Sequence, residues 1–473
     1  MEQWELIEQN PWWENPEKIN EDSKIKEFSH SRLQWFPRIF NEFDFSSFKI
    51  YTIRGMRQVG KTTLLKLLIR KLLHENYPSK SIFYYSLDFT HSYKEITEIY
   101  RKFKLYAEGN GIKKTFVFLD EITSVLNWQR AIKHLVDIGL AQNSVFILTG
   151  SSAIDIKKGS ERMPGRRGGG MELDKVLLPL SFREYMENKI SLPENFKILL
   201  NLEDFLALSE QSLTTYLMHY PQIQNLFEEY VQVGGLPMAV NELWQKGSIS
   251  KETYDIFLSV IISDIEKWRL KRTILKQVMK RVYEIFGSRW SWQGLAKGID
   301  VGSFHTVTQY VETLADSYIL SILYFFDPSR RKILPKKEKK IYFLDPLIFR
   351  LFASSYGISP ASYGEPIVFS KLIEGVVFSH LLRISGENLS EGLSYLENLH
   401  YWYSKRGSEI DFVIQREKSL LPVEVKYQEK ISPSDYITLS RVFGKGLVLT
   451  KKECFKREEI IGIPVSLFLA LSR

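Results

Sequence analysis

The stretch Gly55-Met56-Arg57-Gln58-Val59-Gly60-Lys61-Thr62 decides the fold of this chain. It follows the apolar, β-branched run 48–53 and precedes the leucine-rich run 64–68. In this context of strand, glycine loop and helix, Gly55 and Gly60 let the backbone curl so that successive N–H groups point at phosphate oxygens. The helix that starts near Lys61 adds the positive end of its dipole. The sequence therefore predicts an α/β fold that contains a P-loop domain built on a parallel sheet.

This segment is the predicted triphosphate site. We expect Lys61 to bridge the β and γ phosphates and the Thr62 hydroxyl to ligate Mg²⁺. The alternative, a simple glycine turn before a helix, does not account for the Lys-Thr pair at this spacing. The predicted nucleotide-binding residues are Gly55, Met56, Arg57, Gln58, Val59, Gly60, Lys61, Thr62, Thr63 and, from a later strand end, Ser151.

The segment 114–119 contains four consecutive apolar residues, 116–119, and is followed by the acidic pair Asp120-Glu121. The run predicts a strand that is buried on both faces. Asp120 is expected to hold Mg²⁺ through water beside Thr62, and Glu121 is expected to orient or deprotonate the attacking water. An apolar strand that ends in Asp-Glu is by itself more often a strand-to-helix cap, so this assignment depends on its pairing with the glycine loop.

Two later segments are candidates to complete the site. The apolar run 144–148 ends in hydroxyl residues, of which Thr149 and Ser151 could touch the γ-phosphate or the water if this strand neighbours the preceding one; turn hydroxyls usually bond only the backbone. Arg166, from the basic glycine-rich loop 162–170, is expected to cancel charge on the transferring phosphoryl group, in cis or from a neighbouring subunit of a homo-oligomer. The alternative for this loop is a solvated connection.

These motifs, from Ile53 through Leu180-Ser181-Phe182-Arg183-Glu184, resemble an AAA+-related family of archaeal and bacterial ATPases. Gly234-Gly235-Leu236-Pro237 and Tyr342-Phe343-Leu344-Asp345-Pro346 extend the resemblance over nearly the whole chain. The resemblance implies ATP as ligand, with a nucleotide domain followed by a winged-helix region and a C-terminal nuclease-like domain. Trp12-Trp13 is also similar to archaeal members, and we expect it to pack over the nucleotide domain.

The predicted organisation has five parts. They are an N-terminal arm at 1–45, a P-loop ATPase domain at 46–200, a helical lid at 201–285, a winged helix at 286–350 and a nuclease-like domain at 351–473.

The predicted winged helix combines two short helices, 292–297 and 303–315, with a hairpin of strands 319–326 and 340–344. The second helix carries Val307, Val311 and Leu314 on one face and His305, Thr306 and Gln309 on another. The hairpin loop holds the basic residues Arg330, Arg331, Lys332, Lys336, Lys337, Lys339 and Lys340. A basic wing beside an exposed polar helix suits double-stranded or branched DNA. The alternative is a solvated hairpin and a helix that packs on protein.

The last domain is predicted to bring two carboxylates and a lysine together. Glu424 and Lys426 alternate along one predicted strand and so share a face, and Asp411 on the paired strand can lie opposite. With Glu374 as a ligand from a helix, this group would bind Mg²⁺ and activate water for phosphodiester cleavage. The arrangement resembles the PD-(D/E)XK nuclease superfamily, although Glu409-Ile410-Asp411 replaces its Pro-Asp approach. The alternative is an inert or DNA-holding domain with a charged solvent face.

Composition bounds the class of protein. The chain of 473 residues has 64 Lys+Arg against 56 Asp+Glu, a net charge of +8, and the single cysteine Cys454. One cysteine excludes a disulfide framework and a thiolate metal site, which fits a reducing compartment. Residues 1–20 carry acids and Trp where a secretion signal needs a basic start, and no apolar run approaches the ~20 residues that span a bilayer. We therefore expect a soluble cytoplasmic protein without a membrane partner, and scarce Cys and Met hint at a hot habitat.

The sequence thus predicts an ATP-hydrolysing enzyme whose nucleotide state moves a winged-helix and nuclease-like tail on DNA. The rival interpretation is a signalling or scaffold NTPase that acts on a protein partner and carries an inert nuclease-like domain. The net charge of +8 does not separate the two.

Overall fold

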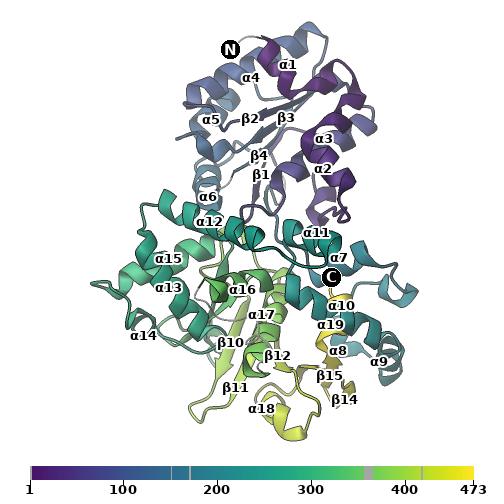
Figure 1. The fold of residues 1–473 in the computed structure, drawn as a ribbon, viewed down its shortest axis with the longest axis vertical. Coiled ribbons are helices and arrows are strands. Elements are labelled where there is room, and N and C mark those ends of the chain that lie inside the picture. The colour runs from purple at the N-terminus through teal and green to yellow at the C-terminus, as the bar shows by residue number, and fades with distance from the viewer. Residues whose placement is uncertain (1–2, 151, 170–171, 356–365, 417–418) are drawn as a thin grey trace. The chain divides into compact units, whose positions relative to one another are not determined.

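The computed structural model describes residues 3–150, 152–169, 172–355, 366–416 and 419–473. The chain forms two compact units, Met1–Leu178 (unit 1) and Pro179–Arg473 (unit 2), and Figure 1 labels many of their helices and strands. Among the described helices, none has both the length and the apolar character that crossing a bilayer requires.

Unit 1 is built on a five-stranded parallel sheet in the order β2-β3-β4-β1-β5. Its strands are β1 (Lys49–Arg54), β2 (Ile82–Ser86), β3 (Thr115–Asp120), β4 (Ser144–Thr149) and β5 (Asp174–Val176). Every residue of β1, β3 and β4 is buried, as expected of inner strands with helices on both faces. The predicted parallel α/β fold is confirmed, and β4 lies between the strand that leads into the glycine loop and the strand that ends in Asp120.

Helices cover both faces of this sheet. α2 (Ser23–His30) and α3 (Lys61–His74) lie on one side, and α4 (Tyr93–Gly109) and α5 (Gln129–Asp137) lie on the other (Figure 1). The unit also contains α6 (Ala153–Glu161) and the short turns η3 (Arg38–Asn41), η4 (Ser79–Ser81) and η5 (Ile122–Ser124). α3 starts directly after Gly60, and its buried leucines anchor the helix on the sheet.

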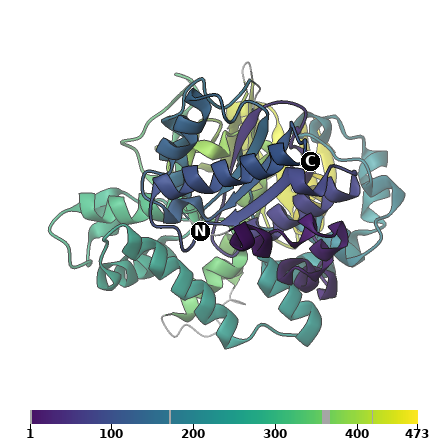
Figure 2. The same cartoon turned by 90° about the horizontal axis from the view of Figure 1, so that it is seen from above.

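The N-terminal segment covers the edge strand β2. Its elements are α1 (Gln3–Gln9), η1 (Pro11–Trp13), η2 (Pro16–Glu21) and α2, drawn in dark purple in Figures 1 and 2. The Asn10 side chain accepts from the backbone N–H of Tyr84 at 2.7 Å and donates to its carbonyl at 2.9 Å, so it pairs with β2 as a neighbouring strand would. Trp12 and Trp13 both donate to the carbonyl of Ile82, at 3.0 and 2.7 Å. The prediction that Trp12-Trp13 packs over the nucleotide domain is confirmed.

The first part of unit 2 is helical. Its helices are α7 (Phe182–Lys189), α8 (Leu202–Ala207), α9 (Glu210–Leu217), α10 (Tyr220–Val233), α11 (Pro237–Lys246), α12 (Lys251–Lys267), α13 (Arg272–Ile285), α14 (Trp292–Ala296) and α15 (Phe304–Asp316), with the turn η6 (Glu194–Phe196). α15 buries Val307, Val311 and Leu314 and exposes His305 and Gln309. The two short helices and the faces predicted for the second one are confirmed.

An antiparallel hairpin follows these helices. β6 (Leu320–Tyr324) pairs with β9 (Lys339–Phe343), and β7 (Phe326–Asp327) pairs with β8 (Lys332–Ile333) inside the connection. The predicted hairpin is confirmed, but the placement of Lys339 and Lys340 in its exposed loop is wrong. These lysines lie on β9 and are only 3% and 1% exposed, because the whole strand is buried. The exposed basic residues of the connection are Arg330, Arg331, Lys332, Lys336 and Lys337.

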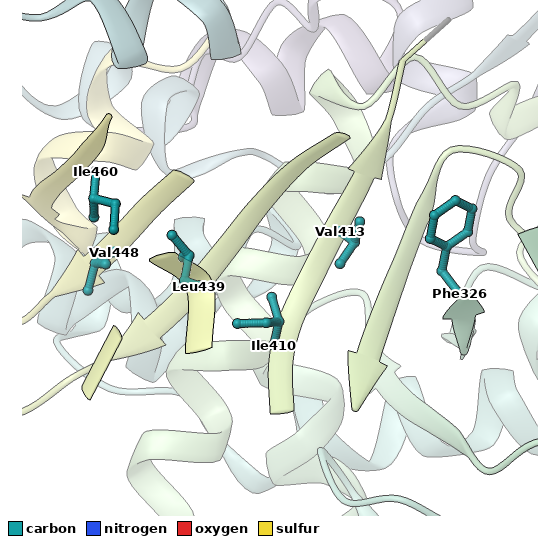
Figure 3. Close-up of a cluster of buried hydrophobic side chains, with 6 residues drawn as sticks. All are labelled: Phe326, Ile410, Val413, Leu439, Val448 and Ile460. Carbon is teal, nitrogen blue, oxygen red and sulfur yellow. The ribbon is translucent and has the colours of Figure 1, made fainter. Parts of the chain in front are cut away.

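The C-terminal part of unit 2 is a mixed six-stranded sheet in the order β10-β11-β12-β13-β15-β14. Its strands are β10 (Leu399–Tyr403), β11 (Glu409–Gln415), β12 (Leu420–Lys426), β13 (Gly446–Thr450), β14 (Phe455–Arg457) and β15 (Ile460–Pro464). The helices are α16 (Pro346–Ser354), α17 (Pro366–Ile384), α18 (Pro433–Phe443) and α19 (Val465–Leu471), with the turn η8 (Leu389–Glu391). The buried cluster in Figure 3 consists of Phe326, Ile410, Val413, Leu439, Val448 and Ile460. Phe326 belongs to β7, so the hairpin connection contributes to the core of the C-terminal sheet.

Candidate functional site

The glycine loop turns tightly between β1 and α3. Gly55, Gln58 and Gly60 have φ angles of 144°, 63° and 103°, in the region that favours glycine. A Cβ added to Gly55 would lie 2.3 Å from the carbonyl oxygen of Leu177, so a larger residue does not fit there. A Cβ at Gly60 would meet no described atom within 4 Å. The first turn of α3 is therefore open to an anion on this side.

The side chains of the loop differ in burial. Met56 and Val59 are buried, Arg57 is half-buried and Gln58 is exposed. Burial of Met56 and Val59 fixes the loop and leaves its backbone N–H groups, not these side chains, to face a ligand.

Lys61 is wrapped by the loop that precedes it. Its side chain is 6% exposed, and Nζ donates to the carbonyl oxygens of Gly55 at 3.0 Å and Met56 at 2.9 Å. Thr62 and Thr63 follow in the first turn of α3 and are half-buried. The structure thus brings together an ammonium group, a hydroxyl group and a helix N-terminus, the donor set that a Mg²⁺-bound triphosphate requires.

Asp120, at the end of β3, is fixed by three donors. Its Oδ1 accepts from the Thr149 hydroxyl and from the backbone N–H of Glu121, and its Oδ2 accepts from the Tyr84 hydroxyl at 3.1 Å. Burial and the charge of Asp120 raise the pKa of Tyr84, so Tyr84 keeps its proton and stays a donor. The predicted neighbourhood of the strands of Asp120 and Thr149 is confirmed. The residue Tyr84 was not predicted, since a tyrosine in an apolar strand resembles any other core residue.

Lys66 connects this carboxylate to the N-terminal segment. It is 5% exposed, its Nζ lies 3.1 Å from Asp22 Oδ2, and the same nitrogen lies 3.2 Å from the centroid of the Tyr84 ring. Burial lowers the pKa of Lys66, and the charges of Asp22 and Asp120 oppose that effect. A lysine on an amphipathic helix is ordinarily expected to face solvent, so the sequence does not predict this contact.

The C-terminal carboxylates also lie together. β11 and β12 are antiparallel, and the backbone N–H of Asp411 donates to Glu424 Oε2 at 3.2 Å. Asp411 Oδ2 accepts from the backbone N–H of Val425 at 2.9 Å, and Lys426 Nζ lies 2.6 Å from Glu424 Oε1. Asp411, Glu424 and Lys426 are therefore brought together.

Lys340 lies at the centre of these acids. Its Nζ lies 2.9 Å from Glu374 Oε1, 3.3 Å from Asp411 Oδ1 and 2.5 Å from Glu409 Oε1. We call Glu374, Glu409, Asp411, Glu424, Lys340 and Lys426 the carboxylate cluster. Among the described residues, no group of three His, Cys, Asp or Glu side chains is placed to hold a metal ion.

Burial and neighbouring charges shift the pKa values of several groups in the carboxylate cluster. Burial and the charge of Asp411 raise the pKa values of both Glu374 and Glu424. Burial acts to lower the pKa of Lys340, but the surrounding acidic groups, Glu374 first among them, raise it well above its ordinary value. The lysine therefore remains an ammonium ion.

Comparison with known protein families identifies the fold of unit 1. Residues 47–186 match a family model described as an AAA domain. Unit 1 has the fold of an AAA-type P-loop ATPase. Two further models, both described as domains of unknown function (DUF8612 and DUF4143), match residues 224–354 and 369–468.

The chain is also similar, at low sequence identity, to proteins that match most of its length. An uncharacterized protein of Methanocaldococcus jannaschii is 25% identical over 399 residues, which cover 80% of this chain and 75% of the relative. A Walker-type ATPase of Pyrococcus abyssi is similar at 16% identity with a TM-score of 0.37, over 72% of this chain and 95% of that structure. The ORC2 protein of Aeropyrum pernix is similar at 13% identity with a TM-score of 0.37, over 72% and 95%.

Arg166 lies at the edge of the AAA domain's sheet opposite the glycine loop. Its Nε donates to Asp137 Oδ1 at 2.6 Å, and Asp137 ends α5, the helix that leads back to the start of β4. The carbonyl of the adjacent Arg167 accepts from the backbone N–H of Ile50, near the start of β1, at 2.9 Å. The structure thus does not bring Arg166 to the glycine loop of the same AAA domain. Ser151 lies outside the described residues.

A basic stripe on α13 is absent from the predicted site residues. Arg272, Lys276 and Lys280 recur at every fourth position and are exposed, so they lie along one side of the helix. The opposite side buries Leu275, Val278, Met279 and Val282. The sequence could have predicted this stripe, because the cations recur at every fourth position and none of them occupies an apolar position of the helix.

Proposed function

We propose that the AAA domain binds Mg²⁺ and ATP and hydrolyses the nucleotide. The observation that carries the proposal is that the glycine loop and Asp120 follow the carboxyl ends of parallel strands in one sheet, the edge where such sheets bind ligands. Thr62 and Asp120 would hold Mg²⁺, which when bound neutralises charge on the β and γ phosphates.

Each residue of the proposed site has a separate task. Lys61 would exchange its two loop carbonyls for the β and γ phosphates, and the backbone N–H groups of the loop would bind the remaining oxygens. Glu121 directly follows Asp120 and would orient the attacking water. Thr149 holds Asp120 and would keep that carboxylate in place as charge develops.

The test is phosphate release by purified wild type, Lys61→Ala and Glu121→Gln. Both substitutions are expected to lower the rate at least about 100-fold, because each removes a group that acts on the transferring phosphoryl group. Lys71→Ala, on the same helix but away from the loop, is the matched control and is expected to hydrolyse ATP like wild type. Wild-type rates in both site variants would contradict the proposal.

We also propose that unit 2 binds duplex DNA through α13, α15 and the hairpin connection. The supporting observation is the distribution of exposed cations, with a stripe along α13 and five basic residues in the connection, together with exposed polar residues on α15. α15 is held to the start of α13 by the bond from the Tyr310 hydroxyl to the carbonyl of Lys271 at 3.0 Å. Cations fixed on packed helices can contact successive phosphates with little loss of entropy.

The DNA proposal is tested by duplex affinity at several salt concentrations. The triple variant Arg272→Gln, Lys276→Gln and Lys280→Gln is expected to bind more weakly and to reduce the slope of log affinity against log salt by about 0.9 for each phosphate that it no longer neutralises. The matched control neutralises three exposed lysines of unit 1, Lys94, Lys102 and Lys113, and is expected to keep the wild-type slope. Equal slopes for the two triple variants would contradict the proposal.

A second candidate function, binding of a protein partner, has one observation in its favour. Phe89 and Leu126 are 90% and 81% exposed, and their loops are tied together by the bond from the Ser124 hydroxyl to the carbonyl of Leu87 at 2.6 Å. Exposed large apolar residues on adjoining loops suit protein contact. Absence of salt-dependent DNA binding in the experiment above would favour this function.

A further inference from the structure

We infer that the ammonium group of Lys340 takes the place of a divalent cation in the carboxylate cluster, so that this cluster binds no metal ion and cleaves no phosphodiester. The inference concerns unit 2 alone and does not depend on ATP hydrolysis. The groups that the structure gathers differ from the expected donor set, because an ammonium nitrogen lies among the carboxylates.

The expected ligands converge on a nitrogen atom. Glu374 from α17 and Asp411 from β11 both point at Lys340 Nζ, at 2.9 and 3.3 Å, and Glu409 reaches it at 2.5 Å. Mg²⁺ requires oxygens at about 2.1 Å in octahedral geometry. A cation at the meeting point of these oxygens would therefore overlap the ammonium group.

The other oxygens of Asp411, Glu424 and Glu409 have partners of their own. Asp411 Oδ2 accepts from the backbone of β12 at 2.9 Å. The two oxygens of Glu424 accept from Lys426 at 2.6 Å and from the backbone of Asp411 at 3.2 Å. Glu409 Oε2 lies 3.3 Å from Arg289 Nε. A metal ion would have to break these bonds as well as displace the ammonium group.

Lys340 is held in this position by its strand. It pairs with Leu323 in the β6–β9 hairpin, and its side chain is only 2% exposed. Lys340 and Tyr342 lie two residues apart and so share one face of β9, and both donate to Glu374 Oε1. Withdrawal of the ammonium group would therefore require the hairpin to shift, because the side chain has no exposed surface into which it could rotate.

The test is Mn²⁺ binding to the full-length chain without nucleotide, measured by titration calorimetry. Wild type and Asp411→Asn are expected to bind Mn²⁺ equally, because Asp411 holds no metal ion in wild type. Lys340→Met removes the ammonium group and is expected to gain a Mn²⁺ site, and the double variant Lys340→Met with Asp411→Asn is expected to lose it. Lys339→Met is the matched control, because it removes a buried lysine from the opposite face of the same strand; it is expected to gain no site.

Three results would overturn the inference. The first is a Mn²⁺ site in wild type that Asp411→Asn removes, and the second is Mn²⁺-dependent nicking of supercoiled DNA that Asp411→Asn abolishes. Neither of these comparisons needs Lys340→Met to fold. The third is a Lys340→Met variant that keeps the wild-type circular dichroism spectrum and gains no Mn²⁺ site, which would show that Lys340 is not the group that excludes the ion.

Discussion

Tyr84 is the residue through which the N-terminal segment reaches the proposed catalytic carboxylate. Asn10 binds its backbone, Lys66 lies over its ring, and its hydroxyl donates to Asp120. We expect Tyr84→Phe to lower kcat for ATP hydrolysis about tenfold, because a hydrogen bond to a charged group contributes about 1.5–3 kcal/mol. The ring and its contact with Lys66 remain in the variant, so the Kd for nucleotide should not change.

Steady-state phosphate release and fluorescent-nucleotide titration separate these two quantities. Tyr85→Phe, one residue along the same strand and on its other face, is the control and is expected to match wild type. An unchanged kcat in Tyr84→Phe would show that Thr149 and the backbone of Glu121 suffice to hold Asp120.

His400 gives unit 2 a pH-dependent stability. It is fully buried, its Nε2 pairs with the carbonyl of Glu397 at 2.9 Å, and its Nδ1 has no hydrogen-bond partner among the described residues. Burial lowers the pKa of His400 to about 4, against the opposing hydrogen bond to Glu397. The folded state therefore keeps His400 neutral at pH values where the unfolded chain, with a pKa of about 6.5, takes up a proton.

The stabilisation is present above about pH 6.5 and is lost as the pH falls from there toward 4. The loss between pH 7 and pH 5 is about 2 kcal/mol, at about 1.4 kcal/mol for each pH unit below 6.5. We expect His400→Phe, which preserves stacking on Phe326, to lose about 2 kcal/mol less than wild type over this range. Urea denaturation at both pH values measures the difference, with the exposed His305→Gln as control. The prediction would be wrong if the free energy of unfolding of wild type and of His400→Phe changed equally between the two pH values.

At the scale of elements, a side chain of the N-terminal segment makes the hydrogen bonds that a sixth strand would make with β2. Asn10 supplies both the donor and the acceptor that the edge of β2 needs at Tyr84. We expect Asn10→Ala to lower the free energy of unfolding of unit 1 by about 2 kcal/mol or more, because two buried backbone groups lose their partners. Tryptophan fluorescence during urea denaturation reports this loss, since Trp12 and Trp13 lie beside Asn10.

Asn15→Ala is the matched control for Asn10→Ala. The Asn15 side chain also accepts from a backbone N–H, that of Glu17 at 3.1 Å, but the bond is exposed. Water can replace an exposed partner, so the expected loss is below about 1 kcal/mol. Equal losses in the two variants would mean that β2 does not depend on this contact.

The elements that the sequence predicts best are those with local signals. The apolar runs before Gly55, Asp120 and Thr149 predict β1, β3 and β4, because continuous burial in a parallel sheet leaves no polar alternation. Arg166 is different, because its loop follows α6, and a loop after a helix can lie at either end of the strands. Its pairing with Asp137 depends on where α5 ends, which no local pattern specifies.

Lys340 shows why the C-terminal cluster could be predicted only in part. The alternation of Glu424 and Lys426 and the pairing with Asp411 follow from strand periodicity. The run around Lys340 is rich in lysine and predicts solvent exposure. Its burial depends on acids that lie 34 or more residues away in the chain, such as Glu374. The sequence of the lysine-rich run does not show that distant acids neutralise the charge of Lys340.

At the scale of the whole molecule, the proposed sites lie in different units, which join at Leu178 and Pro179. If nucleotide state controls DNA binding, the two binding sites are coupled by one free energy. This free energy changes the affinity for each ligand by the same factor when the other ligand is bound. The factor by which a non-hydrolysable ATP analogue changes the Kd for DNA must then equal the factor by which DNA changes the Kd for the analogue. Typical couplings of about 1–3 kcal/mol correspond to about 5–150-fold.

We expect the two factors to agree in wild type and to fall to one in Lys61→Ala, which should keep the nucleotide-free affinity for DNA because its substitution lies in unit 1. Duplex titrations with and without the analogue, and analogue titrations with and without duplex, supply the four Kd values. Two factors of one in wild type would mean that the units bind their ligands independently. ATP turnover would then have to act on something other than DNA affinity, and the exposed Phe89 and Leu126 beside the AAA domain's strand ends would become the next surface to mutate.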